Sequence, residues 1–137
     1  MLLRLDRHSG VPVYRQIQDQ IRFLVASAVL APGVELPSTR ALAAALGLNP
    51  MSVSKAYALL EREGVLERRP GLALVVRART RSQRESARTD ELRAELRSSV
   101  FVAQRLGFTV DEALAVYRAM LTEGHAEKQE RQGGAGA

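Results

Sequence analysis

The stretch "LGLNPMSVSKAY" gathers the side chains of this chain that are best suited to bind another molecule. Asn49 carries an amide, Ser52 and Ser54 carry short hydroxyls, and Lys55 carries an ammonium group. Short hydroxyls and amides allow a helix backbone to approach a polar surface closely, and lysine adds a charge that favours an anion. Groups of these kinds recognise a partner through hydrogen bonds. Whether they can do so here depends on the helices that present them.

Residue types that could catalyse a reaction are few and poorly placed. His8 and His125 fall in the expected lead and tail, where no rigid shell would hold them. Carboxylates cluster at Asp90, Glu91 and Glu95 and again at Asp111 and Glu112. Capping of helix starts explains both clusters. Without a cysteine, a phosphate-binding glycine loop or metal-ligand spacing, the sequence predicts no enzyme, no cofactor and no metal site.

The length is that of one domain, or of one small domain with a short appendage. The chain has 137 residues, of which 46% are hydrophobic and 4% aromatic, so the core must consist mainly of aliphatic side chains. The absence of cysteine suits a reducing compartment. No apolar run approaches the roughly 18 residues that span a bilayer. We therefore expect a soluble, cytoplasmic protein with no membrane partner.

The first predicted helix begins at Pro12, which fits a first helical turn because proline lacks an N–H. In "VYRQIQDQIRFLVASAVL" the apolar residues recur at helical spacing: Tyr14, Ile17, Ile21, Leu24, Val25 and Ala28. The run Ala31-Pro32-Gly33 is expected to end this helix.

Two more helices are delimited by strong local signals. Ser38 is placed to cap the helix "TRALAAAL", and Gly47 is expected to close it. Asn49 then caps a third helix, with Pro50 in its first position and Gly64 after its end.

A helical wheel separates the two faces of the third helix. Its apolar face consists of Val53, Ala56, Tyr57 and Leu60. The opposite face consists of Met51, Lys55, Ala58 and Arg62, flanked by Ser52 and Ser54. One face therefore belongs to a core and the other is free to meet a partner.

After Gly64 the apolar residues no longer recur at helical spacing. "VLERR", a Pro70-Gly71 turn and "LALVV" predict a two-stranded hairpin. A basic segment follows, with Arg77, Arg79, Arg81 and Arg84, and it is either a hinge or the start of the next helix.

Two helices are predicted in the last third of the chain. The first has an apolar stripe with Phe101 beside it: Leu92, Leu96, Val100, Ala103 and Leu106. Gly107-Phe108 interrupts it, and Thr109 with Glu112 forms a capping box for the second helix. That helix presents Leu114, Tyr117, Met120 and Leu121. From Gly124 the sequence is polar and rich in Gly and Ala, and we expect disorder.

These elements predict a mainly α fold with a small β-hairpin. Residues 1–77 form a winged helix-turn-helix, residues 78–90 a basic linker or helix start, residues 91–123 a two-helix dimerisation segment and residues 124–137 a disordered tail. Basic and acidic residues are distributed unevenly between the front and the back of the chain. Residues 1–81 hold twelve Lys and Arg against six Asp and Glu, whereas the rest of the chain holds eight against nine.

A helix, a glycine corner, a polar-fronted helix and a basic hairpin in this order favour binding of duplex DNA. Each piece alone has a plainer interpretation. Helix corners occur in many helical proteins, Ser52 and Ser54 could be ordinary surface residues, and Arg68 and Arg69 could protect a strand edge. Ordered together on a basic segment, they make DNA binding the stronger interpretation.

Residues 5–76 resemble the DNA-binding domain of GntR-type bacterial transcription factors. The resemblance is carried by "SGVPVY", by "LPSTR" and by "NP" followed by "YALLEREG". The last fifty or so residues, with their two helices, resemble the YtrA subgroup.

The resemblance implies a set of DNA contacts. Ser38, Thr39 and Arg40 would meet backbone phosphate at the start of their helix. The groove-facing set would be Asn49, Met51, Ser52, Ser54 and Lys55, and the wing would add Arg68, Arg69 and Gly71. Met51 stands where relatives commonly carry a polar residue, so it either meets a thymine methyl or reads no base. The wing lacks the usual second Gly and Thr after its tip.

The two C-terminal helices are too small to form a core of their own. A homodimer would cover their stripes, through Leu92, Leu96, Val100, Leu106, Leu114, Tyr117 and Leu121. The alternative is that both helices fold back onto the first helix. A small-molecule effector could still bind between these helices or at the dimer interface, and the sequence identifies no such ligand.

The leading hypothesis is a homodimeric transcription regulator, a repressor, that binds a palindromic DNA operator. Control of a transporter operon is implied by the resemblance alone. The competing hypothesis is a winged-helix adaptor that binds protein without specific DNA binding.

Overall fold

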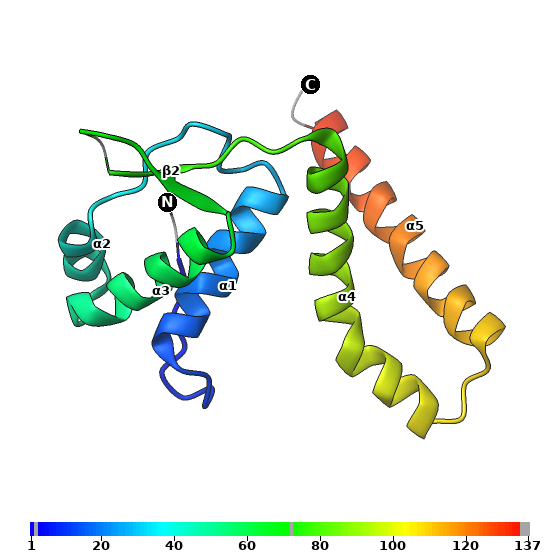
Figure 1. Ribbon diagram of the computed structural model, residues 1–137. Helices are drawn as coiled ribbons and strands as arrows, with labels where there is room; N and C mark the ends of the chain where they lie inside the picture. The colour runs from blue at the N-terminus through cyan, green and yellow to red at the C-terminus, as the bar shows by residue number, and fades with distance from the viewer. Residues whose placement is uncertain (2, 72, 135–137) are drawn as a thin grey trace. The chain divides into compact units, whose positions relative to one another are not determined.

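The computed structural model describes residues 1, 3–71 and 73–134. In chain order the elements are α1 (Val13–Ala26), α2 (Thr39–Leu46), α3 (Pro50–Arg62), β1 (Leu66–Arg68), β2 (Leu74–Val76), α4 (Arg81–Arg105) and α5 (Val110–Gly134) (Figure 1). The chain divides into two compact units, Met1–Leu92 and Arg93–Ala137. The predicted mainly α fold with a small hairpin is confirmed.

The core of the first unit is built around α3, which packs against α1, α2 and β1. Its buried side chains are mostly aliphatic, as the composition predicts: Ile17, Ile21, Leu42, Val53, Leu60, Val65, Leu66, Leu74 and Val76. Burying each of the larger ones contributes about 1.5–3 kcal/mol. The predicted apolar face of α3 is confirmed, because Ala56 and Tyr57 are buried as well.

The end of α1 differs from the prediction. The helix ends at Ala26, with Ser27 as its C-cap, and does not continue to residues 31–33. Pro12 is the N-cap and not the first helical residue. Ala28 has a left-handed backbone with φ 62°, which no continuing helix would allow. Apolar residues continue after Ala26, so the hydrophobic pattern used for the prediction is longer than the helix.

Residues 3–11 are bound to α1 by two glutamine side chains. Gln20 accepts from the Arg4 N–H at 2.8 Å and donates to the Arg4 carbonyl at 2.6 Å. Gln16 does the same with Asp6, at 2.8 and 2.7 Å. Leu3 is buried in the core. The lead is therefore part of the folded unit.

The segment before α2 also forms backbone hydrogen bonds with the hairpin, along the second edge of β2. β1 and β2 pair antiparallel, with Leu66 opposite Val76. On the other edge of β2, the Leu36 N–H donates to the Leu74 carbonyl at 2.8 Å and the Val76 N–H donates to the Val34 carbonyl at 2.9 Å. β2 is therefore paired on both edges, and all three of its residues are buried.

A polar network ties α1 to the end of α3. Arg22 donates to both carboxylate oxygens of Glu63, at 2.9 and 2.7 Å, and Gln18 donates to Glu63 at 2.6 Å. Arg22 also forms an ion pair with Asp19 at 2.9 Å. Burial opposes the charged form of Glu63, but the hydrogen bonds and charge of Arg22 hold its pKa below the usual value.

The second unit consists of the later part of α4 and of α5. The predicted capping box is present: the Thr109 N–H donates to Glu112 Oε1 at 3.1 Å, and the Glu112 N–H donates to Thr109 Oγ1 at 3.2 Å. These bonds lower the pKa of Glu112. Among the described residues, no helix has both the length and the apolar run that crossing a bilayer requires.

The structure agrees with one predicted alternative at the start of this region and differs from the prediction at its end. α4 begins at Arg81, so the basic segment is largely a helix start. Residues 124–134, expected to be disordered, continue α5. The stretch "HAEKQER" contains mainly good helix formers and no proline, which outweighed the glycines that suggested disorder. Residues 135–137 of the predicted tail lie outside the described residues.

Candidate nucleic-acid interface

The corner between α2 and α3 is built by the local signals that the sequence carries. Ser38 Oγ accepts from the Ala41 N–H at 3.0 Å, and Asn49 Oδ1 accepts from the Met51 N–H at 2.9 Å. Gly47 closes α2 in the left-handed conformation, with φ 67°. Ser38 and Asn49 are both exposed, but one lone pair of each side chain already serves as a cap.

A contact from outside the motif supports the same corner. Arg7 Nη2 donates to the Gly47 carbonyl at 3.0 Å, across 40 residues of sequence. The last carbonyls of a helix have no partner within the helix and carry partial negative charge. Sequence analysis missed this role of Arg7, because nothing in the local pattern relates the two positions.

The outer face of α3 begins with exposed side chains, as predicted. Met51 is 76% exposed, Ser54 and Lys55 are exposed and Ser52 is half-buried. The Lys55 ammonium lies 4.0 Å from the centre of the Tyr14 ring on α1. This cation–π contact holds the lysine beside α1 in the free protein.

A groove of about 250 Å³ runs between the start of α2, the outer face of α3 and the wing, which is the β1–β2 hairpin. Four predicted contact residues line it: Ser38, Thr39, Ser54 and Arg68. Tyr57 and Pro37 also line the groove, and the Tyr57 hydroxyl donates to the Pro37 carbonyl at 2.8 Å. Burial raises the pKa of Tyr57 to about 12, so the hydroxyl keeps its proton.

The two wing arginines are paired with acidic neighbours. Arg68 lies 3.7 Å from Glu61 of α3, and Arg69 lies 3.0 Å from Glu67. Gly71 has φ 75°, a conformation that suits glycine at the turn. Sequence analysis missed Glu61, which lines the groove and moderates its positive charge.

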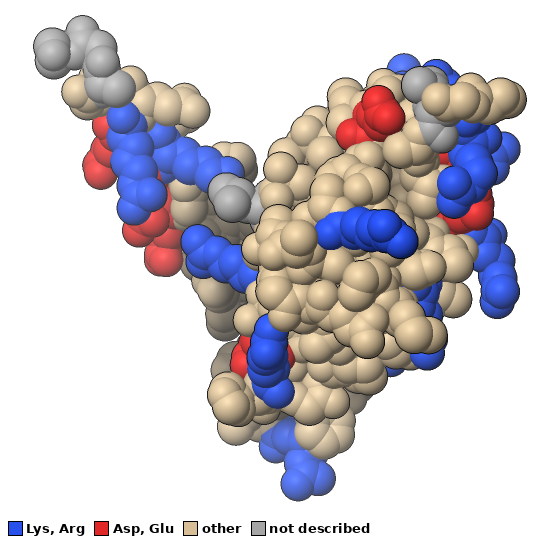
Figure 2. Space-filling view, turned by 90° about the vertical axis from the view of Figure 1, so that its left-hand side faces the viewer, with Lys and Arg blue, Asp and Glu red and all other residues tan. Residues whose placement is uncertain are grey.

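The remaining predicted residue, Arg40, is exposed on α2. Figure 2 views the molecule from the α2 side and shows separate basic side chains on a largely uncharged face, with a further basic group beside the wing. The predicted contacts thus form two sets. One lines the groove, and the other, with Arg40, Met51 and Lys55, stands on open surface.

The residues predicted to form a dimer lie on α4 and α5, except Leu106, which lies in the turn directly after α4. Leu92, Val100, Leu106, Leu114 and Leu121 are exposed, and Leu96 and Tyr117 are half-buried. Within the second unit a groove of about 440 Å³ between α4 and α5 has an apolar lining that includes Val102, Leu106 and Met120. None of the described residues of these two helices is buried.

Within the described part of the chain, no group of three or more His, Asp or Glu side chains comes together. What the interface offers is hydroxyl, amide and basic groups around a helix that can enter a DNA groove.

Comparison with known proteins gives a consistent picture. Residues 13–76 match the family described as bacterial regulatory proteins, gntR family. The chain is 30% identical over 111 residues to the HTH-type transcriptional repressor YtrA of Bacillus subtilis (strain 168), covering 81% of this chain and 85% of that protein.

Two solved structures share the architecture. YtrA from Sulfolobus acidocaldarius, a GntR-family transcription factor, is 32% identical with a TM-score of 0.54, covering 88% of this chain and 97% of that one. A transcriptional regulator from Oenococcus oeni is 28% identical with a TM-score of 0.67 and the same coverage. These relatives are transcription regulators and not enzymes, as the sequence predicts. The protein therefore belongs to the GntR family of DNA-binding bacterial regulators and is YtrA-like.

Proposed function

We propose that this regulator is a homodimeric repressor that binds a palindromic operator in the cytoplasm. The observation that carries the proposal is the division of α3 into two faces. Val53 and Leu60 are fully buried, whereas Met51 and Lys55 on the opposite side are exposed at the N-terminal end of the helix. A helix anchored in this way can insert its first turns into the major groove.

Phosphate contacts would come from the elements around α3. Arg40 on α2 has an exposed guanidinium group, which suits a phosphate oxygen. Arg68 at the wing lies across the groove from α2. Such contacts fix the position of the protein on duplex DNA, and the groove-facing side chains of α3 then select the sequence.

The apolar surface of α4 and α5 supports the dimer. The exposed apolar side chains there are large and numerous: Val100, Phe101, Val102, Leu106, Val110, Leu114, Val116, Met120 and Leu121. Some of these side chains line one groove between α4 and α5, and exposed apolar surface of this kind marks an interaction site. A second copy related by a two-fold axis would cover it and would place two α3 helices on two half-sites of a palindrome. The repressor role is supported by the similarity to the transcriptional repressor YtrA of Bacillus subtilis.

The test is selection of bound fragments from the native genome, followed by affinity measurements on the recovered site. Binding should be salt-dependent, and the recovered site should be an inverted repeat. Arg40→Gln should weaken binding to all DNA by about tenfold, and Ser52→Ala should change base preference with a smaller loss, on the order of 1 kcal/mol. Arg97→Gln on α4 is the matched charge control.

Two outcomes would contradict the proposal. Equal affinity for the recovered site and a scrambled duplex would remove sequence specificity. No binding to any duplex at low salt would favour the adaptor hypothesis instead.

A further inference from the structure

A second groove, of about 360 Å³, lies within the first unit and away from α3. It is lined by the end of α1 and the turn after it, by the segment that leaves β2 and by the first turns of α4. We call it the arginine groove after five of its lining residues: Arg77, Arg79, Arg81, Arg84 and Arg88. Its volume falls within the range of small-molecule sites, about 300–1,000 Å³.

The arginine groove combines two kinds of surface. Val25, Leu30 and Val76 supply aliphatic lining, and the guanidinium groups supply positive charge. Guanidinium groups offer paired N–H donors that match the two oxygens of a carboxylate or phosphate. An aliphatic lining favours an alkyl or aryl group beside that anion. The groove thus suits a ligand with both parts.

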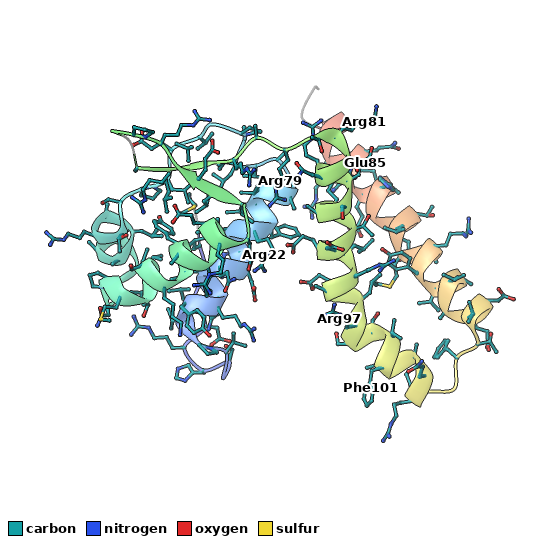
Figure 3. All side chains as sticks on the ribbon, in the orientation of Figure 1. Arg22, Arg79, Arg81, Glu85, Arg97 and Phe101 are labelled. Atoms are coloured by element: carbon teal, nitrogen blue, oxygen red, sulfur yellow. The ribbon has the colours of Figure 1, made fainter. Side chains whose placement is uncertain are left out.

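The acidic side chain in the lining does not balance this charge. Glu85 is bound to Arg81, with Arg81 Nε 3.2 Å from its carboxylate (Figure 3). Arg79 is half-buried and helps to lower the pKa of Glu63, but the carboxylate of Glu63 already accepts two hydrogen bonds from Arg22. The groove therefore keeps an excess of positive charge.

The backbone at the edge of the groove is also unusual. Ala28 lines it and has φ 62°, a region in which a residue other than glycine is strained by roughly 1 kcal/mol or more. This conformation ends α1, because Ala28 directly follows the C-cap Ser27.

We propose that the arginine groove binds a small amphipathic anion, with its carboxylate or phosphate at the guanidinium groups and a short apolar part on Val25, Leu30 and Val76. A regulatory meaning rests on the proposed function. The groove includes the start of α4, the helix that continues into the proposed dimerisation segment, so such a ligand would be an effector.

The test uses the full chain without DNA and hexyl phosphate as the probe, followed by isothermal titration calorimetry. We expect saturable binding of one probe per chain, with inorganic phosphate and hexanol each at least tenfold weaker. The double variant R84Q/R88Q should weaken hexyl phosphate binding by tenfold or more. The matched control is R93Q/R97Q, which removes the same charge from α4 outside the groove and should leave the affinity unchanged. Circular dichroism should show both variants folded.

Three results would overturn the proposal: no saturable binding of hexyl phosphate, equal binding of inorganic phosphate, or equal loss in the two double variants. A fourth would be a reduced salt dependence of DNA binding in R84Q/R88Q alone, because the arginines would then be phosphate contacts. Since the probe is measured without DNA, its failure leaves the repressor proposal standing. Conversely, failure of DNA binding would not alter the calorimetry.

Discussion

Arg7 reaches from the N-terminal lead to the Gly47 carbonyl, 3.0 Å away, and so caps the C-terminal end of α2 from a distant part of the chain. The bond joins a cation to the negative end of a helix dipole, at the corner from which α3 begins. The lead thereby supports the position of the proposed recognition helix.

Arg7→Gln should lower the free energy of unfolding by about 0.5–1 kcal/mol, because this exposed bond is lost and the carbonyl returns to solvent. Chemical denaturation at a fixed protein concentration measures the change. Arg4→Gln is the control, since the bonds at Arg4 join its backbone to Gln20 and do not use its side chain. An equal loss in both variants would show that the Gly47 contact is not responsible.

The Arg22–Glu63 pair should make stability depend on acidity. The folded-state pKa of Glu63 is lowered, so its contribution is present above the unfolded pKa of about 4.3 and is lost as pH falls through the folded value. Glu63→Gln should cost about 1 kcal/mol at pH 7 and should flatten the decline in stability below about pH 5. Thermal unfolding between pH 3 and 7 measures this. Glu95→Gln, on the exposed surface of α4, should keep the wild-type profile.

Glu61 should restrain the affinity of the wing for DNA. Glu61→Gln removes a carboxylate from the groove beside α3 and frees Arg68 from its partner 3.7 Å away. We expect affinity for any duplex to rise about two- to fivefold at low salt, because less repulsion opposes the phosphates. Fluorescence anisotropy on specific and scrambled duplexes measures the gain. Glu123→Gln makes the same charge change on α5, and an equal gain there would point to net charge alone.

Leu114 should be required for the proposed dimer. Leu114→Glu places a charge within the exposed apolar surface of α5, where a partner would have to bury it. Sedimentation should show the particle mass falling from two chains to one. Val29→Glu is the control, because Val29 is exposed outside α4 and α5. A dimer that survives Leu114→Glu would place the contact elsewhere.

Elements with strong capping residues could be predicted closely from the sequence. The limits of α2 and α3 follow from Ser38, Gly47, Asn49 and Pro50, whose effects act within a few residues. The buried face of α3 follows from helical periodicity. The end of α1 could not be predicted in this way, because its apolar pattern continues through a turn that only tertiary packing requires.

Contacts between different elements were beyond prediction for a similar reason. The Glu61–Arg68 and Arg7–Gly47 contacts join residues that no periodicity relates. The site residues chosen from the sequence remain predictions, and the structure shows only which of them share the groove. It also adds a distinction between groove-lining residues and residues on open surface.

The hydrogen bonds from Gln16 and Gln20 to the N-terminal lead affect how this DNA-binding unit can be moved into a chimeric protein. The family match begins at residue 13, yet Leu3 lies in the core and Gln16 and Gln20 hold the backbone of Arg4 and Asp6. A chimera spliced at the match boundary would uncover part of the aliphatic interior and leave two amides without their partners. Grafts intended to redirect this regulator should therefore carry the first dozen residues with them.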